Sequence, residues 1–205
     1  PVGAVYGYTT MLWKLADDLH KADGPTHLAV ILDKSSQSFR NEIYDQYKAN
    51  RPPPPEDLVP QFPLIRDATR AFSLPCIEEP DVEADDIIAS YAREAQRQGW
   101  HVTIVSSDKD LMQLVSDTVL MLDTMKNARI YIDEVEEKFG VGPDKVGDVL
   151  ALMGDSVDNI PGIFGVGPKT ASKLIAEHGG LTAALDAAEG MKKSKLKERL
   201  IEHRA

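Results

Sequence analysis

The chain has 205 residues, of which 42% are hydrophobic and 27% charged, so it can form one sizeable α/β domain with a small helical appendage and is neither disordered nor fibrous. The formal net charge of −10 argues at first against nucleic acid as a partner, because phosphates are bound mainly by Lys and Arg, although the acids could gather around bound cations. With a single cysteine, Cys76, and no apolar run near the length that spans a bilayer, the sequence predicts a cytoplasmic protein without a membrane partner or a cysteine-based metal site.

Helical and extended patterns alternate along most of the chain. The expected helices cover residues 4–19, 39–50, 62–72, 84–98 and 109–115, and the helix over 39–50 should stop at the four prolines 52–55. The expected strands cover residues 27–33, 74–78, 101–106, 119–122 and 129–132. This alternation predicts an α/β fold with a mostly parallel central sheet flanked by helices, where ligands bind beyond the carboxyl ends of the strands.

Four acidic clusters fall at the expected strand ends and loop mouths. Each has a local explanation as a turn, a helix cap or a complement to a helix dipole. Brought to one edge of a sheet, however, eight carboxylates would repel one another unless divalent cations neutralised them, and oxygen ligands suit Mg²⁺ or Mn²⁺. Two such ions could activate a water and stabilise the leaving oxygen in phosphodiester hydrolysis. The eight candidate metal ligands are Asp33, Glu83, Asp85, Asp86, Asp108, Asp110, Asp155 and Asp158.

The part of the chain after Pro143 has a different character, because short helices separated by glycine-rich turns replace the strands. We therefore expect an α/β domain over 1–142 and a helical domain over 143–205. The motif DSVDNIPGIFGVGPKTA over 155–171 predicts a helix-hairpin-helix, in which the glycines Gly165 and Gly167 let the backbone approach DNA. The helix that opens at Pro168 would offer N–H groups to a phosphate, and Lys169 would add a charge. A purely structural turn between two helices is the alternative.

A basic and aromatic face is expected on the helix before the prolines. Its members follow helical spacing: Arg40, Tyr44, Tyr47, Lys48 and Arg51. Cations interleaved with aromatic rings suit a single strand of nucleic acid, whereas the alternative is a solvated amphipathic face with half-packed tyrosines. The basic segment over 192–199 leaves the same choice between phosphate contact and simple solvation.

With these motifs, the chain resembles the flap endonuclease family, and within it the 5′→3′ exonuclease domain of bacterial DNA polymerase I. The matching stretches run in the family's order: PVGAVYGYTTML, ILD, FRNEIYDQYKANRPPPPEDL, EADD, SDKDLMQLV and GDSVDNIPGIFGVGPKTASKL. The resemblance implies a nuclease domain of the PIN-like type with a helical arch over about 34–72, followed by the helix-hairpin-helix domain. It also implies that the eight acids bind the metals, and that Lys48 contacts the scissile phosphate in the arch with Arg51 as the second catalytic residue.

The same resemblance implies a metal-dependent 5′→3′ exonuclease and 5′ flap endonuclease of DNA repair and replication. The partner would be flapped, nicked or gapped DNA, bound by a monomer in the bacterial cytoplasm, at the nucleoid, with polymerase domains following in the parent chain. The expected DNA-binding residues are Arg40, Tyr44, Tyr47, Gly165, Gly167, Lys169, Thr170 and Lys173. In relatives the hairpin also holds a potassium ion through backbone carbonyls, so K⁺ joins Mg²⁺ and Mn²⁺ as an expected cofactor.

One departure from the family leaves two alternatives open. Family members begin with a strand whose Asp-Gly pair supplies a further metal ligand, and the present sequence starts after that strand. A non-catalytic DNA-binding fragment is therefore one alternative. An Asp-rich α/β phosphatase, which would have no use for the hairpin or the arch, is the other.

Overall fold

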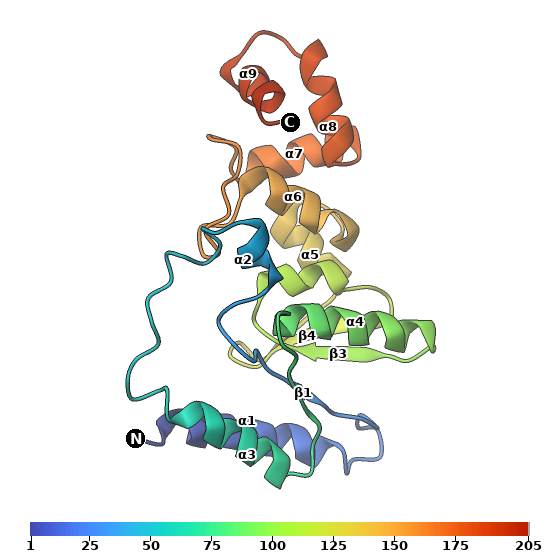
Figure 1. Ribbon diagram of the computed structural model, residues 1–205. Helices are drawn as coiled ribbons and strands as arrows, with labels where there is room; N and C mark the ends of the chain where they lie inside the picture. The colour runs from blue at the N-terminus through green and yellow to red at the C-terminus, as the bar shows by residue number, and fades with distance from the viewer. Residues whose placement is uncertain (205) are drawn as a thin grey trace. The chain divides into compact units, whose positions relative to one another are not determined.

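The computed structural model describes residues 1–204, which divide into two compact units (Figure 1). The first unit combines Pro1–Ile43 with Arg51–Ile87, and the second combines Tyr44–Asn50 with the chain from Ile88 onward. No helix among the described residues is long and apolar enough to cross a membrane. The α/β fold class is confirmed. The strands form two small sheets with mostly parallel pairing, helices flank them, and a compact helical part follows.

The first unit contains α1 (Gly3–Asp18), β1 (Val30–Ile31), α2 (Phe39–Ile43), α3 (Gln61–Ala71), β2 (Cys76–Ile77) and the first turn of α4 (Ala84–Arg97). Helices α1 and α3 pack side by side, because the buried side chain of Gln61 accepts hydrogen bonds from the N–H groups of Ala4 and Val5 at 2.9 and 3.2 Å. These donors belong to the first turn of α1, where a helix has no internal partners for them. Strand β1 runs parallel to β2.

The second unit contains a three-stranded sheet and the C-terminal helices. The sheet consists of β3 (Val102–Val105), β4 (Val119–Asp123) and β5 (Ala128–Ile130). Strand β3 pairs with β4 in parallel, and β5 pairs with β4 in the antiparallel direction. The second pairing follows from its short connection, since parallel strands need a long crossover. The side chain of Asp123 shapes this turn by accepting the N–H groups of Met125 and Lys126.

The helical elements of the second unit follow the sheet in sequence. After the 3₁₀ helix η1 (Lys109–Leu114), which lies between β3 and β4, come α5 (Ile132–Phe139), η2 (Pro143–Lys145), α6 (Val146–Met153), α7 (Pro168–His178), α8 (Leu181–Ala187), η3 (Ala188–Gly190) and α9 (Lys195–Glu202). One hydrophobic core joins the sheet to these helices, with Met121, Val149, Ile175 and Leu200 at most 1% exposed. Because that core continues across residue 142, the domain boundary expected there stays a prediction.

Two of the expected helices differ in the structure. The helix expected over 39–50 ends at Ile43, and Asp45–Asn50 form consecutive turns. The segment expected as a helix over 109–115 is the 3₁₀ helix η1, which Asp108 begins by accepting the N–H of Asp110. A side chain that caps two residues ahead favours such a tight turn over a regular α-helix.

Candidate functional site

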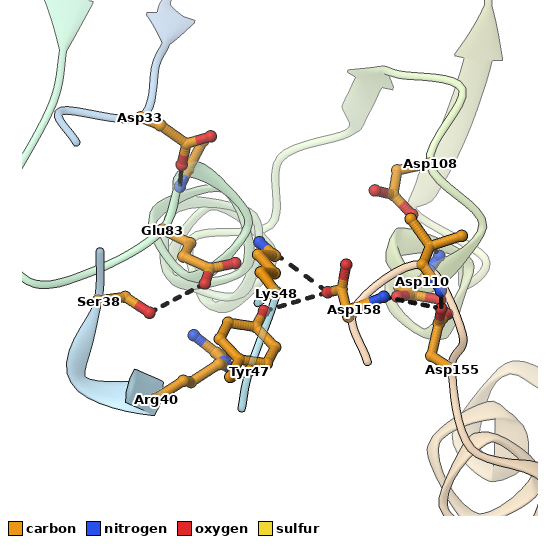
Figure 2. Close-up of polar contacts among 12 residues, drawn as sticks. Asp33, Ser38, Arg40, Tyr47, Lys48, Glu83, Asp108, Asp110, Asp155 and Asp158 are labelled. Atoms are coloured by element: carbon orange, nitrogen blue, oxygen red, sulfur yellow. Dashed lines mark hydrogen bonds and ion pairs between the residues drawn. The ribbon is translucent and has the colours of Figure 1, made fainter. Parts of the chain in front are cut away.

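The acids of the first unit surround the start of α4. Asp33 follows β1, and its carboxylate accepts the N–H of Ala84 at 2.7 Å. Glu83 accepts a hydrogen bond from the hydroxyl of the buried Ser38 at 2.9 Å (Figure 2). Asp85 and Asp86 lie in the first turn of the helix. These acids therefore do cap the start of the helix, as the local explanation expected. Capping does not exclude metal binding, because a carboxylate that caps with one oxygen can bind a cation with the other.

Arg40 is paired within the same unit. Its guanidinium makes a bidentate ion pair with Asp86, with nitrogen to oxygen distances of 2.6 and 2.8 Å. Such fork-like pairs are among the strongest polar contacts that Arg makes. The role of Arg40 as a DNA contact stays a prediction, and it would compete with this ion pair.

The acids of the second unit lie on η1 and on the loop after α6. Asp108 is the cap of η1, and Asp110 follows two residues later. One carboxylate oxygen of Asp110, Oδ1, is buried and accepts no hydrogen bond from the described residues. Burial raises the pKa of Asp110, and the neighbouring charge of Lys109 only partly offsets this effect. A buried, unsatisfied oxygen in an acidic group suits a bound cation.

Lys109 forms ion pairs with two acids of this second group. Its ammonium makes an ion pair with Asp155 and lies 3.7 Å from Oδ1 of Asp110. Partial burial alone would raise the pKa of Asp155, yet this pKa is lowered, because Lys109 and the N–H groups of Val157 and Asp158 donate hydrogen bonds to the carboxylate. Lys109 is not among the site residues predicted from the sequence, although its place between two acids in SDKD is a usable signal.

A short segment carrying Tyr47 and Lys48 is bound to the loop over 155–160. The hydroxyl of the buried Tyr47 donates to Oδ2 of Asp158 at 3.1 Å, and Nζ of Lys48 lies 3.9 Å from the same oxygen (Figure 2). The N–H of Lys48 donates to the carbonyl of Asp158 at 2.9 Å. Side-chain amides of Asn50 and Asn159 add one bond in each direction, to the carbonyls of Ser156 and Gln46.

These contacts explain why the prediction of a helix that carries the basic and aromatic residues up to Arg51 is wrong. Lys48 has φ of 55°, a left-handed conformation that an α-helix cannot contain. Tyr47 is buried, with only 6% of its surface exposed, and the N–H of its neighbour Lys48 donates to the carbonyl of Asp158, which is far along the chain. The five expected members, Arg40, Tyr44, Tyr47, Lys48 and Arg51, therefore do not share one helix face.

The expected helix-hairpin-helix geometry is present between α6 and α7. Gly165 has φ of 82°, and α7 begins at Pro168 directly after Gly167. Gly162 passes so close to the backbone of Met153 and Gly154 that a Cβ atom on Gly162 would lie 2.2 Å from the carbonyl carbon of Met153.

The residues expected to bind DNA at the start of α7 differ in their contacts. Lys169 is exposed, whereas Thr170 donates its N–H to the carbonyl of Gly167. Nζ of Lys173 lies 3.7 Å from Oε1 of Glu177 on the same helix.

Four of the eight acids belong to the first unit and four to the second. Among residues 1–204, no three Asp, Glu, His or Cys side chains form a cluster that could hold a metal ion as they stand. A shared metal site for all eight therefore stays a prediction. The donor set itself fits a hard cation, since it consists of carboxylate oxygens and includes the buried Oδ1 of Asp110.

Two family models match the chain and together cover it. A model described as 5′-3′ exonuclease, N-terminal resolvase-like domain, matches residues 1–140. A model described as 5′-3′ exonuclease, C-terminal SAM fold, matches residues 141–205.

Curated relatives carry related names. A DNA polymerase I of Rhizobium leguminosarum is 57% identical over 204 residues, which are 98% of this chain and 20% of the relative. A 5′-3′ exonuclease of Aquifex aeolicus is 42% identical over 181 residues, which are 88% of this chain and 61% of the relative. The chain thus spans only a fifth of the length of the polymerase relative.

Solved structures of a bacteriophage T5 nuclease have a similar fold. The T5 5′-exonuclease with bound zinc has a TM-score of 0.80 and 26% identity, and the match covers 95% of this chain and 74% of that one. The T5 flap endonuclease in a complex with DNA and metal ions also has a TM-score of 0.80, with 25% identity over 98% of this chain and 75% of that one.

Proposed function

Because the chain belongs to the 5′-3′ exonuclease family, we propose that it hydrolyses DNA phosphodiester bonds from a 5′ end and at 5′ flaps, with divalent cations as cofactors. The observation that carries this proposal is the set of carboxylates at the start of α4, on η1 and on the loop over 155–158. One buried oxygen of Asp110 in this set has no hydrogen-bond donor among residues 1–204. The T5 neighbours solved with metal ions and DNA support the same chemistry.

The proposed metal ligands are the eight acids predicted from the sequence, and the proposed ions are two or more Mg²⁺ or Mn²⁺. When bound, such ions supply a nucleophilic water and neutralise charge on the leaving oxygen. The carboxylate of Asp155, whose pKa is lowered, stays ionised at neutral pH and is available as a ligand. Lys109 neutralises part of this acidic group and would have to move away from Asp155 when a cation binds there.

The basic residues would divide the work of binding DNA. We propose that Lys48 and Arg51 act on the reacting strand, and that Tyr44 and Tyr47 belong to the segment that guides it. The turn at Gly165 and Gly167, with Lys169, Thr170 and Lys173, would bind the duplex through backbone N–H groups and charge, with K⁺ at the turn as an additional proposed ion. The polymerase relative is about five times as long as the matched region, and we propose that the chain likewise works as part of a longer bacterial protein, in DNA repair and replication.

The direct test is cleavage of a 5′ flap substrate labelled at its 5′ end. We expect products with millimolar Mg²⁺ or Mn²⁺ and none after chelation. Binding of flap DNA without cleavage would support the alternative of a non-catalytic DNA-binding fragment. Hydrolysis of small phosphate esters together with no affinity for DNA would support the phosphatase alternative. Either outcome would contradict the proposed nuclease function.

Thermal stability should rise when Mg²⁺ or Mn²⁺ is added. Ions that bind only the folded state stabilise it by mass action, by about 2.7 kcal/mol at 100 times Kd. For a chain of this size that corresponds to an increase in Tm of roughly 5–10 °C. Asp110→Asn should reduce the increase, whereas Asp117→Asn, which changes an exposed acid outside the four clusters, should not. A Tm that is equally insensitive to Mn²⁺ and to Na⁺ at matched ionic strength would show that the acids serve only as caps and turns.

A further inference from the structure

The tip of the turn before α7 is held from outside by one side chain of α9. Nη1 of Arg199 donates a hydrogen bond to the carbonyl of Phe164 at 2.6 Å, although the two residues are 35 positions apart. The guanidinium carbon of Arg199 also lies 4.6 Å from the centre of the Phe164 ring. One side chain thus holds both the backbone and the ring of the same residue, by a charge-assisted hydrogen bond and a cation–π contact.

The base and the tip of this turn are held in different ways. At its base, Ile163 and Val166 are buried, and the N–H of Val166 donates to the carbonyl of Ile163. At its tip, the side chain of Phe164 is 76% exposed and Gly165 is exposed as well. The hydrophobic core therefore fixes the base of the turn but does not reach the tip, where Arg199 supplies the contact.

Helix α9, which carries Arg199, is held in place by its own contacts. Leu200, the neighbour of Arg199, has no exposed surface. Ser194 caps the helix by accepting the N–H of Lys197, and Nζ of Lys197 donates to the carbonyls of Glu189 and Met191 at 2.6 and 3.1 Å. Because α9 is anchored at both its start and its buried face, Arg199 reaches the turn from a defined position.

The contact with Arg199 requires a glycine at the tip of the turn. Gly165 has φ of 82°, which L side chains rarely adopt, and a Cβ atom at this position would lie 2.5 Å from Nη1 of Arg199. The guanidinium thus occupies the space that a side chain at residue 165 would need. The bare backbone of Gly165 and the side chain of Arg199 form one packed unit.

We infer that Arg199 is a positioning residue for duplex binding, which holds the Phe164–Gly165 tip in the conformation that presents the turn and the start of α7 to a DNA phosphate. This inference rests on the proposed function. It also assigns a role within the basic segment over 192–199: Arg199 acts through Phe164 and does not contact the phosphate itself. A turn that is already ordered before binding loses less conformational entropy when DNA binds.

The test compares Arg199→Lys and Arg199→Ala in the intact protein, by duplex affinity as a function of salt concentration. Lys keeps the charge but loses the planar guanidinium, so we expect both variants to weaken binding by roughly tenfold, the effect of one charge-assisted hydrogen bond. The slope of affinity against salt should stay unchanged in both. Lys169→Ala is the reference for a direct phosphate contact and should make that slope shallower by roughly 0.9. The single-turnover cleavage rate at saturating DNA should not change in the Arg199 variants.

Three outcomes of the binding measurements would overturn the inference. Normal affinity in Arg199→Lys with a shallower slope in Arg199→Ala would make Arg199 a direct phosphate contact. An equal loss in Lys195→Ala, which removes an exposed charge from the same helix, would indicate a general charge effect. Phe164→Leu alters an exposed side chain and should combine with Arg199→Ala less than additively, so strictly additive losses would also count against the coupling.

A measurement without DNA separates this inference from the proposed function. In the free protein, Arg199→Ala should speed hydrogen exchange of the backbone N–H groups at residues 164–167 while Tm and exchange in α7 stay as in the wild type. If the wild-type protein failed to bind duplex DNA, the proposed function would fail, but this exchange measurement would still decide whether Arg199 positions the turn. Unchanged exchange at the tip would refute that role.

Discussion

Replacing Lys48 by alanine should lower the single-turnover rate of flap cleavage by on the order of 10²-fold or more, because a cation beside the scissile phosphate stabilises charge that develops in the transition state. Affinity for uncleaved flap DNA should hardly change. The substitution keeps the backbone N–H that donates to the carbonyl of Asp158. The segment over 44–50 should therefore stay bound to its loop, and the loss should report on the ammonium group.

The left-handed backbone of Lys48, with φ of 55°, calls for a second variant. Lys48→Asn also removes the charge, and Asn tolerates this conformation better than other residues that have a Cβ atom. It should be as slow as Lys48→Ala. Lys126→Ala, which changes a lysine whose side chain is 79% exposed, serves as the control for net charge and should cleave at the wild-type rate. If affinity for uncleaved DNA fell in proportion to the rate, Lys48 would be an ordinary phosphate anchor.

Replacing Asp108 by asparagine should lower the cleavage rate by on the order of 10²–10³-fold or more, while DNA affinity stays within several-fold of the wild type. Asp108 caps η1 through its carboxylate, and asparagine is an equally good capping residue. The fold should therefore survive, and the lost charge should act through the metal. Asp85→Asn in the first unit should have the same effect if both groups of acids serve the reaction.

The matched control for these two variants is Asp117→Asn, which removes one exposed carboxylate outside the predicted ligand set. Titration with Mn²⁺ adds a second measurement, since a lost ligand should raise the metal concentration needed for half-maximal rate. Wild-type rates and an unchanged metal requirement in Asp108→Asn would remove Asp108 from the proposed site. Equal losses in Asp117→Asn would point to a general effect of charge.

The expected positions of the acids and the hairpin came from local sequence patterns. Short apolar runs predicted β3 and β4, and the acids of SDKD follow β3 directly as expected. The turn at Gly165 could also be predicted, because its φ of 82° is a conformation that favours glycine. Such features depend on residues within one or two turns of one another, so the order of residue types is enough to predict them.

Tertiary contacts decided what these patterns could not. The end of α2 at Ile43 and the left-handed Lys48 accompany contacts with the loop over 155–160, and Tyr47 and Asp158 are 111 positions apart. Likewise, nothing local to KERL predicts that Arg199 bonds to Phe164. The sequence by itself therefore determined which residues are acidic, basic or turn-forming and where they occur. The tertiary structure alone decided their partners, because a hydrogen bond between distant residues depends on how the chain packs.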